Sequence, residues 1–464
     1  MTQTAIRSTN PAHPDDVLVE VPAAGPHDVA KAAEAARAAQ RDWQAQPPTA
    51  RSAALSAAAD AVAAASDELT SLMVREVGKP LGEAAGEAAR AVAILRYYAQ
   101  QVLDPDGETY PAPGTTLLMA RRRPRGVAGL VTPWNFPFAI PLWKAAPALA
   151  FGNAVLLKPA PEATACALRL AELLHESLPA DLVAVVPGGA ETGQAVVAEA
   201  DVVSFTGSVA AGAAVREAAA RRGVPAQCEM GGQNPSIVLP DVDVEATAAV
   251  LAGAAMGYAG QKCTATSRVV VVDDGQGFPQ RFTDALVAAV EAVGVGDPAE
   301  QGVAVGPVIT EPARDAVVAA AREAEQSGGR VLTGGTVPDD DGWFVVPTLV
   351  DGVAPDARVA QEEVFGPFAA VLTASDSEHA VALANGVRYG LAAAVFTRDL
   401  DQALQLADRL EAGLVRVNAP TSGVDFYAPF GGEKESSYGP REQGKAARDF
   451  YTSVRTVTVA GAPS

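Results

Sequence analysis

The sequence contains a cysteine and a glutamate in settings that suit covalent catalysis. Cys263 lies in the segment GQKCT at residues 260–264, on a loop that begins with glycine, and Glu229 stands just before the pair Gly231-Gly232. A thiolate can attack a carbonyl carbon, and a carboxylate can activate the thiol or a later water. The pair predicts a thioester mechanism, although an isolated cysteine is more often inert and an isolated glutamate more often forms a surface ion pair.

A rigid turn carries a candidate for stabilising negative charge. Asn135 lies in TPWNFP at residues 132–137, between two prolines that restrict the backbone. A fixed side-chain amide can donate to a tetrahedral oxyanion and lower the barrier by roughly 3 kcal/mol. The competing interpretation is an asparagine that bonds only to its own turn.

Two further segments suit a nucleotide. The segment FTGS at residues 205–208 ends a strand and begins a helix, whose free N–H groups attract an anion, although a bare strand-turn-helix is weak support. Lys158 ends another strand, and nucleotides bind at the carboxyl ends of parallel strands. A surface lysine is the alternative for Lys158. A second carboxylate, Glu363, lies on the tight turn EVFGP at residues 363–367.

The elements that must position these residues are α/β in pattern. Helices are expected over 26–66, with a break at Pro47-Pro48, and over 66–102, whereas 103–125 is expected to be extended or a hairpin. From residue 126 strands alternate with helices, which predicts a parallel sheet covered on both faces, and a second α/β stretch runs over 236–430. Residues 455–459 alternate like an edge strand, which could pair within the chain or with another subunit.

Composition excludes several other classes of function. The chain has 464 residues, 49% of them hydrophobic, and a net charge of −20, which opposes binding to nucleic acid or an anionic membrane. Its three cysteines suggest a reducing cytoplasm, and its four histidines lack metal-ligand spacing. The first eight residues do not resemble a signal peptide, and no apolar run reaches the roughly 18 residues of a membrane span.

Together the motifs resemble those of the aldehyde dehydrogenase family, over about residues 8–460. The resemblance implies that Cys263 is the nucleophile, that Glu229 is the general base, and that Asn135 and the Cys263 backbone N–H form the oxyanion hole. It also implies a cofactor, NAD or NADP, and an aldehyde that is oxidised to a carboxylic acid by hydride transfer and thioester hydrolysis. The residues expected to bind the cofactor are Trp134, Lys158, Phe205, Gly207, Ser208, Glu363 and Phe365.

The family architecture is the expected fold. It implies a Rossmann-type parallel-sheet cofactor domain from residues 1–103 and 126–231 and an α/β catalytic domain from residues 232–431. A small oligomerisation element is expected from residues 104–125 and 445–464, in a homodimer or homotetramer. In the family the C-terminal strand extends a neighbour's sheet, which favours intersubunit pairing of 455–459.

Two positions refine the expected cofactor and reaction. Relatives that transfer the acyl group to coenzyme A generally lack the base, so Glu229 favours hydrolysis. Family members often carry a glutamate three residues after the lysine, where it disfavours NADP. Here Pro161 stands at that position and Glu162 follows it, so NADP is expected to be accepted.

Within the family, three stretches resemble bacterial α-ketoglutaric semialdehyde dehydrogenases: 260–268, 413–421 and 430–444. Arg268 or Arg416 is a candidate for binding a substrate carboxylate. The alternative for each arginine is a structural salt bridge. Asp425 and its neighbours Phe426 and Tyr427 suit a neutral or aromatic aldehyde at least as well as an anionic one. The predicted substrate pocket comprises Phe136, Lys262, Thr264, Phe426, Tyr427 and Phe430.

Two other functions compete with this prediction. A non-catalytic scaffold of the same fold would be expected to lose Cys263, Glu229 or Asn135, and all three residues are present. An esterase that uses the same thiol would need no cofactor, so a cofactor-free ester assay separates it from the dehydrogenase.

Overall fold

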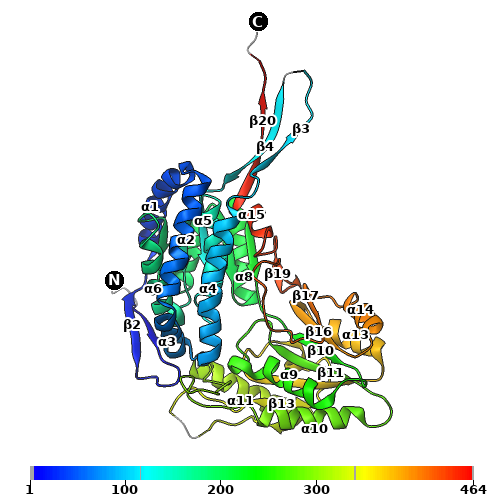
Figure 1. Ribbon diagram of the computed structural model, residues 1–464. Coiled ribbons are helices and arrows are strands. Elements are labelled where there is room, and N and C mark those ends of the chain that lie inside the picture. The colour runs from blue at the N-terminus through cyan, green and yellow to red at the C-terminus, as the bar shows by residue number, and fades with distance from the viewer. Residues whose placement is uncertain (1–4, 115, 339–340, 462–464) are drawn as a thin grey trace.

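The computed structural model describes residues 5–114, 116–338 and 341–461. Positions 1–4, 115, 339–340 and 462–464, which the predicted segments include, lie outside the described residues. The chain forms two largely parallel sheets with helices against them and a three-stranded antiparallel arm that projects from the body (Figure 1). The predicted α/β fold is confirmed.

The first large sheet carries most of the N-terminal site motifs. Its six strands have the order β19-β9-β8-β5-β6-β7. All neighbours are parallel except β19, which pairs antiparallel with β9. Strands β5 and β6 are buried along their whole length, as expected for parallel strands covered on both faces. The strands are β5 (Val127–Val131), β6 (Ala154–Lys158), β7 (Val183–Val185), β8 (Val202–Thr206), β9 (Ala226–Glu229) and β19 (Ser437–Tyr438).

Helices from the first half of the chain cover this sheet (Figure 1). Pro47 and Pro48 end α1 and begin α2, and Gly78 ends α3 with φ +63°, a conformation that glycine adopts without strain. The predicted break at the prolines is therefore confirmed. The helices are α1 (Pro26–Ala45), α2 (Pro48–Ala64), α3 (Ser66–Val77), α4 (Leu81–Gln101), α5 (Ala139–Ala150), η1 (Pro161–Ala163), α6 (Thr164–His175), α7 (Ala190–Glu199) and α8 (Val209–Arg222).

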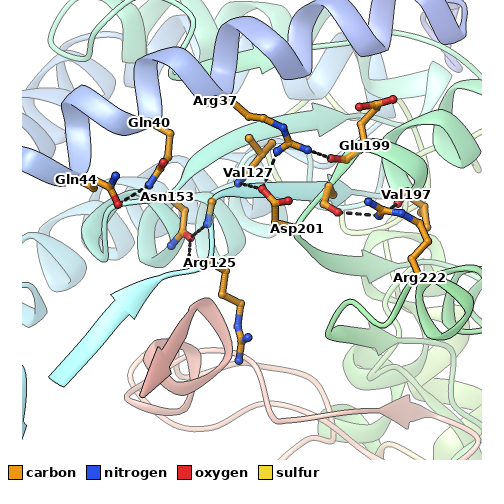
Figure 2. Close-up of polar contacts among 12 residues, drawn as sticks. Arg37, Gln40, Gln44, Arg125, Val127, Asn153, Val197, Glu199, Asp201 and Arg222 are labelled. Atoms are coloured by element: carbon orange, nitrogen blue, oxygen red, sulfur yellow. Dashed lines mark hydrogen bonds and ion pairs between the residues drawn. The ribbon is translucent and has the colours of Figure 1, made fainter. Parts of the chain in front are cut away.

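A polar cluster fixes the start of β5, the strand that leads to the Asn135 turn (Figure 2). Arg37 on α1 forms an ion pair with Asp201 at 2.7 Å, and the same carboxylate accepts the Val127 N–H at 2.8 Å. Asn153 accepts the N–H groups of Arg125 and residue 126 at 2.8 and 3.0 Å. These bonds satisfy backbone groups ahead of the strand and hold α1 against the sheet.

The second large sheet has seven strands in the order β12-β13-β14-β11-β10-β16-β17, parallel except for β12 against β13. The strands are β10 (Asn234–Val238), β11 (Thr266–Val272), β12 (Arg330–Thr333), β13 (Thr348–Asp351), β14 (Phe368–Ala374), β16 (Ala392–Phe396) and β17 (Leu414–Val417). Its helices are α9 (Val244–Met256), η2 (Gly257–Gly260), α10 (Phe278–Glu291), α11 (Glu311–Gln326), α12 (Arg358–Gln361), α13 (Ser377–Asn385) and α14 (Leu400–Ala407).

The arm is a sheet of β3 (Gly107–Tyr110), β4 (Leu117–Pro124) and β20 (Thr452–Val459), joined to the body by α15 (Ala446–Tyr451). Strand β20 pairs antiparallel with β4 of its own chain, with Thr452 opposite Pro124. One edge of the C-terminal strand thus pairs within the chain, which was one of the two possibilities predicted for residues 455–459. Among the described residues, no strand pairs with its other edge. An unpaired strand edge of this kind presents backbone N–H and C=O groups.

Small elements complete the fold. A hairpin of β1 (Ala5–Thr9) and β2 (Val17–Pro22), which the sequence analysis did not predict, lies near α3 (Figure 1). Strands β15 (Tyr389–Gly390) and β18 (Glu433–Lys434) form a two-stranded ladder. Within the part of the chain that the structure describes, no helix is long and apolar enough to span a membrane, and no group of acidic, histidine or cysteine side chains is arranged to bind a metal.

Candidate active site

The Cys263 loop lies between α9 and β11 and has an unusual backbone. Tyr258, Ala259 and Gly260 are all left-handed, with φ of 55°, 51° and 64°. A Cβ at position 260 would lie 2.1 Å from the carbonyl oxygen of Gly366, so only glycine fits there. Asn234 donates to the carbonyl oxygens of Cys263 and Ala265, each at 2.8 Å. The loop is therefore fixed from both sides, and Cys263 as a whole residue is partly exposed.

The Cys263 thiol is surrounded by groups that disfavour its ionisation. Burial, followed by the nearby carboxylates of Glu363 and Glu229, raises its pKa to about 12. The unliganded protein therefore holds a thiol, and the cysteine must lose its proton before it can attack.

This environment predicts how fast Cys263 reacts with iodoacetamide. The alkylation rate should rise about tenfold per pH unit from pH 7 to 10, because the thiolate fraction grows in that proportion below the pKa. The Glu363→Gln variant should react faster, because it lacks the charge that contributes most to the shift. The pKa of Glu363 is about 7, so the difference should grow above pH 7, where Glu363 ionises. A rate that levels off near pH 8 would contradict the raised pKa.

Asn135 reaches the Cys263 loop from the opposite sheet. Its side chain is 3% exposed, and its amide nitrogen donates to the carbonyl oxygen of Gln261 at 3.0 Å. The amide carries a second N–H besides this one. Gln261 is itself held, because its side-chain oxygen accepts the Ile309 N–H at 2.8 Å. The geometry places a fixed amide donor beside the loop that bears the thiol.

Glu229 ends β9 and is 2% exposed. Ser437, its partner in β19, donates a hydrogen bond to the carboxylate. Burial raises the Glu229 pKa well above its usual value, and the negative charge of Glu442 raises it further. A Cβ at Gly431 would lie 2.8 Å from a carboxylate oxygen of Glu229, so glycine leaves the base room. A carboxyl group with a raised pKa is suited to taking up a proton.

A buried polar network that was not predicted from the sequence lies behind Glu229. Lys144 on α5 forms an ion pair with Glu442 and donates to Ser204 at 2.8 Å. Trp143 donates to Glu442 at 2.9 Å. The sequence held one signal for it, since Lys144 is the only charged residue in the apolar helix α5. A buried lysine in such a helix needs a carboxylate partner, but the sequence does not say which one.

Glu363 and Phe365 lie on the turn before β14. The Glu363 carboxylate accepts the Gly232 N–H at 3.2 Å. It approaches so closely that a Cβ at Gly231 would lie 1.9 Å from one of its oxygens. Phe365 is left-handed, with φ +53°, and its ring meets Trp134 edge-on at 5.7 Å. Such a strained residue is held by its surroundings and is common at functional sites.

A cavity of about 900 Å³ opens at the carboxyl ends of β5, β6 and β8. Lys158 lines it and donates to the carbonyl oxygen of Gly188 at 2.9 Å, and burial lowers its pKa to about 8. Ser208 caps α8 by accepting the Ala211 N–H at 3.3 Å. Other predicted cofactor residues that line this cavity are Trp134, Phe205 and Gly207.

The cavity fits the implied dinucleotide. It lies where parallel sheets bind nucleotides, and the N-terminal end of the 14-residue helix α8 lines it through Ser208 and Ala211, where the positive end of the helix dipole suits a pyrophosphate. A Cβ at Gly207 would lie 2.6 Å from the Phe205 ring, so the turn requires glycine. Pro161 also lines the cavity, at the position where family members often carry a glutamate.

The predicted substrate residues fall into different surroundings. Phe136 packs edge-on with Tyr258 at 6.3 Å, and Phe426 packs edge-on with Tyr97 at 5.8 Å. Tyr427 is 60% exposed and contacts Phe426. The remaining three are Lys262, which forms an ion pair with Glu83, Thr264, which is buried, and Phe430, which is buried against Trp143.

The two candidate arginines differ. Arg268 is 1% exposed, and its guanidinium donates to the carbonyl oxygens of Gln233, Leu383 and Ala384. It therefore has a structural role, although through main-chain bonds and not through a salt bridge. Arg416 is partly exposed, bonds to the Gly423 carbonyl oxygen and lies 3.9 Å from Asp425.

Comparison with known proteins decides the family. The pattern of the aldehyde dehydrogenase family matches residues 1–457. The chain belongs to this family. It is 40% identical to the α-ketoglutaric semialdehyde dehydrogenase of Bacillus subtilis, over 98% of this chain and 94% of that protein. It is also 40% identical to the α-ketoglutarate semialdehyde dehydrogenase of Haloferax volcanii, over 97% of this chain and 94% of the relative.

A solved structure agrees with this assignment. The betaine aldehyde dehydrogenase of Staphylococcus aureus, crystallised with NAD⁺, superposes with a TM-score of 0.94 at 30% identity, covering 99% of this chain and 93% of the other. The predicted family and fold are confirmed. This aldehyde dehydrogenase is an oxidoreductase that oxidises an aldehyde with NAD or NADP.

Proposed function

We propose that this enzyme oxidises a semialdehyde, with α-ketoglutaric semialdehyde as the leading candidate, to a carboxylic acid through a thioester on Cys263. The observation that carries the mechanism is the meeting of three fixed groups around one loop. The Asn135 amide bonds to Gln261 of the Cys263 loop, and the charges of Glu363 and Glu229 both act on the thiol. The semialdehyde is suggested by two relatives that are named for it and by a third that is named for 2,5-dioxopentanoate, which is the same compound.

Each site residue has a defined task in this mechanism. After Cys263 loses its proton, its sulfur attacks the aldehyde carbon, and the Asn135 amide and the Cys263 backbone N–H hold the resulting oxyanion. The dinucleotide, when bound, would supply the acceptor for the hydride from the aldehyde carbon, and the sulfur would then carry a thioester. Glu229 then takes a proton from water as the water attacks the thioester carbon, and the acid departs as the thiolate re-forms.

The family suggests the roles of the seven predicted cofactor residues, and five of them line the cavity: Trp134, Lys158, Phe205, Gly207 and Ser208. Ser208 and Trp134 would contact the pyrophosphate, Lys158 and Glu363 would hold ribose hydroxyls, and Phe365 would pack by the nicotinamide. Phe205 and Gly207 would shape the turn beneath the phosphates. Because Pro161 lines the cavity where a glutamate would repel a 2′-phosphate, we propose that NADP is accepted as well as NAD.

The architecture suggests the domain boundaries and a homo-oligomeric assembly. We assign residues 1–103 and 126–231 to the cofactor domain, 232–431 to the catalytic domain, and 104–125 with 445–464 to oligomerisation. The projecting arm with the free edge of β20 supports a homodimer or homotetramer. The unpaired cysteines fit a reducing compartment, and we propose the cytoplasm.

The substrate proposal has one specific competitor. Arg416 can offer a cation to a substrate carboxylate near the loop that bears Asp425 and Phe426, which favours a semialdehyde. The aromatic cluster of Tyr97, Phe426 and Tyr427 favours an aromatic or neutral aldehyde instead. Both alternatives leave the chemistry at Cys263 unchanged.

An aldehyde panel separates the two. The rate of reduced-cofactor formation should be measured with carboxylate-bearing semialdehydes, aliphatic aldehydes and aromatic aldehydes, each with NAD and with NADP. We expect the highest kcat/KM with α-ketoglutaric semialdehyde. The Arg416→Leu variant should raise KM for that substrate by about tenfold or more, as loss of a charged hydrogen bond would, and leave benzaldehyde oxidation unaffected. Preference for aromatic aldehydes would reject the semialdehyde.

A further inference from the structure

Lys79 and Glu87 form a fully buried ion pair far in sequence from the predicted catalytic residues. Lys79 follows α3, Glu87 lies on α4, and their exposures are 0% and 3%. The Lys79 ammonium also donates to the backbone carbonyl oxygen of Asn135 at 2.7 Å. A charge from the N-terminal helices thus bonds directly to the residue proposed to hold the oxyanion.

Glu87 holds the other side of the same turn. One oxygen of its carboxylate accepts the N–H groups of Phe138 and Ala139, each at 2.9 Å. These N–H groups belong to the start of α5, where the helix leaves them without an internal partner and where negative charge is favoured. The pair therefore binds this segment of backbone at two places. Lys79 binds it at Asn135, and Glu87 binds it three and four residues later, at Phe138 and Ala139.

The Lys79 ammonium also joins the turn to the Cys263 loop. It lies 3.8 Å from the centre of the Phe136 ring and 4.5 Å from the centre of the Tyr258 ring. Phe136 follows Asn135, whereas Tyr258 is a left-handed residue at the start of the loop that leads to Cys263. Gln261 donates its backbone N–H to the Tyr258 carbonyl oxygen at 3.0 Å and accepts from the Asn135 amide. One cation thus contacts both sides of the proposed oxyanion hole.

Stability alone does not account for two charges at this place. Burial lowers the pKa of Lys79, and the neighbouring carboxylate of Glu87 opposes that shift. Burying an ion pair costs solvation, and apolar residues of similar volume are often as stabilising. Apolar residues cannot form directed hydrogen bonds. The Lys79–Glu87 pair forms them to the Asn135 carbonyl and to the N–H groups at the start of α5.

We infer that the Lys79–Glu87 pair is a positioning device that sets the Asn135 amide against the Cys263 loop. This inference rests on the proposed role of Asn135 in holding the oxyanion. Neither residue touches the substrate. Loss of the pair should leave the thiol in place and allow the amide to drift, and a shift of about 1 Å can cost about 100-fold in rate.

The test uses two variants of the full chain. Lys79→Met removes the cation, and the double variant K79M/E87Q removes both charges while residue 87 keeps an oxygen for the Phe138 and Ala139 N–H groups. We expect kcat of each to fall by about 100-fold with saturating aldehyde and NAD. The iodoacetamide reaction of Cys263 needs no oxyanion hole, so its rate should stay at the wild-type value.

Two controls separate positioning from folding. Glu76→Gln alters another buried carboxylate, which accepts the N–H groups of Ala165 and Cys166 at the start of α6, each at 2.7 Å. Its kcat should stay near wild type. Asn135→Ala should lower kcat by roughly 100- to 1,000-fold, and adding Lys79→Met to it should cost little more, because both changes remove the same interaction.

The contrary outcomes are distinct. A folded K79M/E87Q protein with wild-type kcat would overturn the inference. A parallel fall of kcat and alkylation rate would also overturn it, since it would mark a general collapse of the site, as would failure of both variants to fold. If the fold-losses of kcat caused by Lys79→Met and by Asn135→Ala multiply in the double variant, the two residues act independently and the inference fails. Unchanged kcat in Asn135→Ala would instead reject the oxyanion role in the proposed function.

Discussion

The Cys263→Ala variant is expected to lose aldehyde oxidation by about 10⁴-fold or more, because removal of a catalytic nucleophile leaves no covalent route to the acid. Binding of NAD should persist, since the cavity at the ends of β5, β6 and β8 does not include residue 263. Turnover is measured by reduced-cofactor formation, and binding by quenching of tryptophan fluorescence, for which Trp134 lies at the cavity.

A matched cysteine provides the control. Cys166 is buried on α6, and burial raises its pKa well above its usual value, as for an inert thiol. Cys166→Ala should keep kcat near wild type and lose only some stability from a small cavity. If Cys263→Ala turned over aldehyde at the wild-type rate, the covalent mechanism would be wrong, whereas lost NAD binding would mean that the substitution disturbs more than the thiol.

The Glu229→Gln variant is expected to stall after the first turnover. Without the base, water attacks the thioester slowly, so the steady-state rate should fall by roughly 100- to 10,000-fold. Reduced cofactor should still form once per active site in a rapid burst, provided that Cys263 can ionise without Glu229. Stopped-flow absorbance measures the burst, and intact-protein mass spectrometry detects the acyl group on Cys263.

The double variant C263A/E229Q identifies the burst, because it should show neither reduced cofactor nor an acyl adduct. If the single variant Glu229→Gln kept the wild-type steady-state rate, Glu229 would not be the base in the hydrolysis step. Loss of the burst as well as of turnover would show that Glu229 also accepts the thiol proton. That outcome agrees with its position, since its charge contributes to the raised pKa of Cys263.

The pH dependence of hydrolysis follows from the surroundings of Glu229. Burial and the charge of Glu442 raise its pKa, while the Ser437 hydrogen bond and Lys144 oppose the shift. A general base acts only when ionised, so deacylation should accelerate as pH rises toward the raised pKa. The Lys144–Glu442 network therefore acts on the base through charge, and the sequence could not have placed it there.

The local elements and their types could be predicted from the sequence. The segments 127–131 and 154–158 were predicted to be strands of the parallel sheet, and both are buried because the two faces of such a strand are covered. Pro47-Pro48 fixed the break between the first two helices. The candidate catalytic residues could be recognised because each lies in a short motif of consecutive residues on a loop or at the end of a strand. Their roles and the domain boundaries stay predictions.

Contacts between residues that are distant in the sequence could not be predicted in this way. Pairing of β19 with β9 brings Ser437 to Glu229 across 208 residues, and Lys79 reaches Asn135 across 56. Arg268 could be a substrate anchor by sequence, but in the fold main-chain carbonyl oxygens bind its guanidinium. The physical reason is the same in each case. A buried polar group must find a partner, but the partner is set by the packing of whole elements, which leaves no periodic signal near either residue.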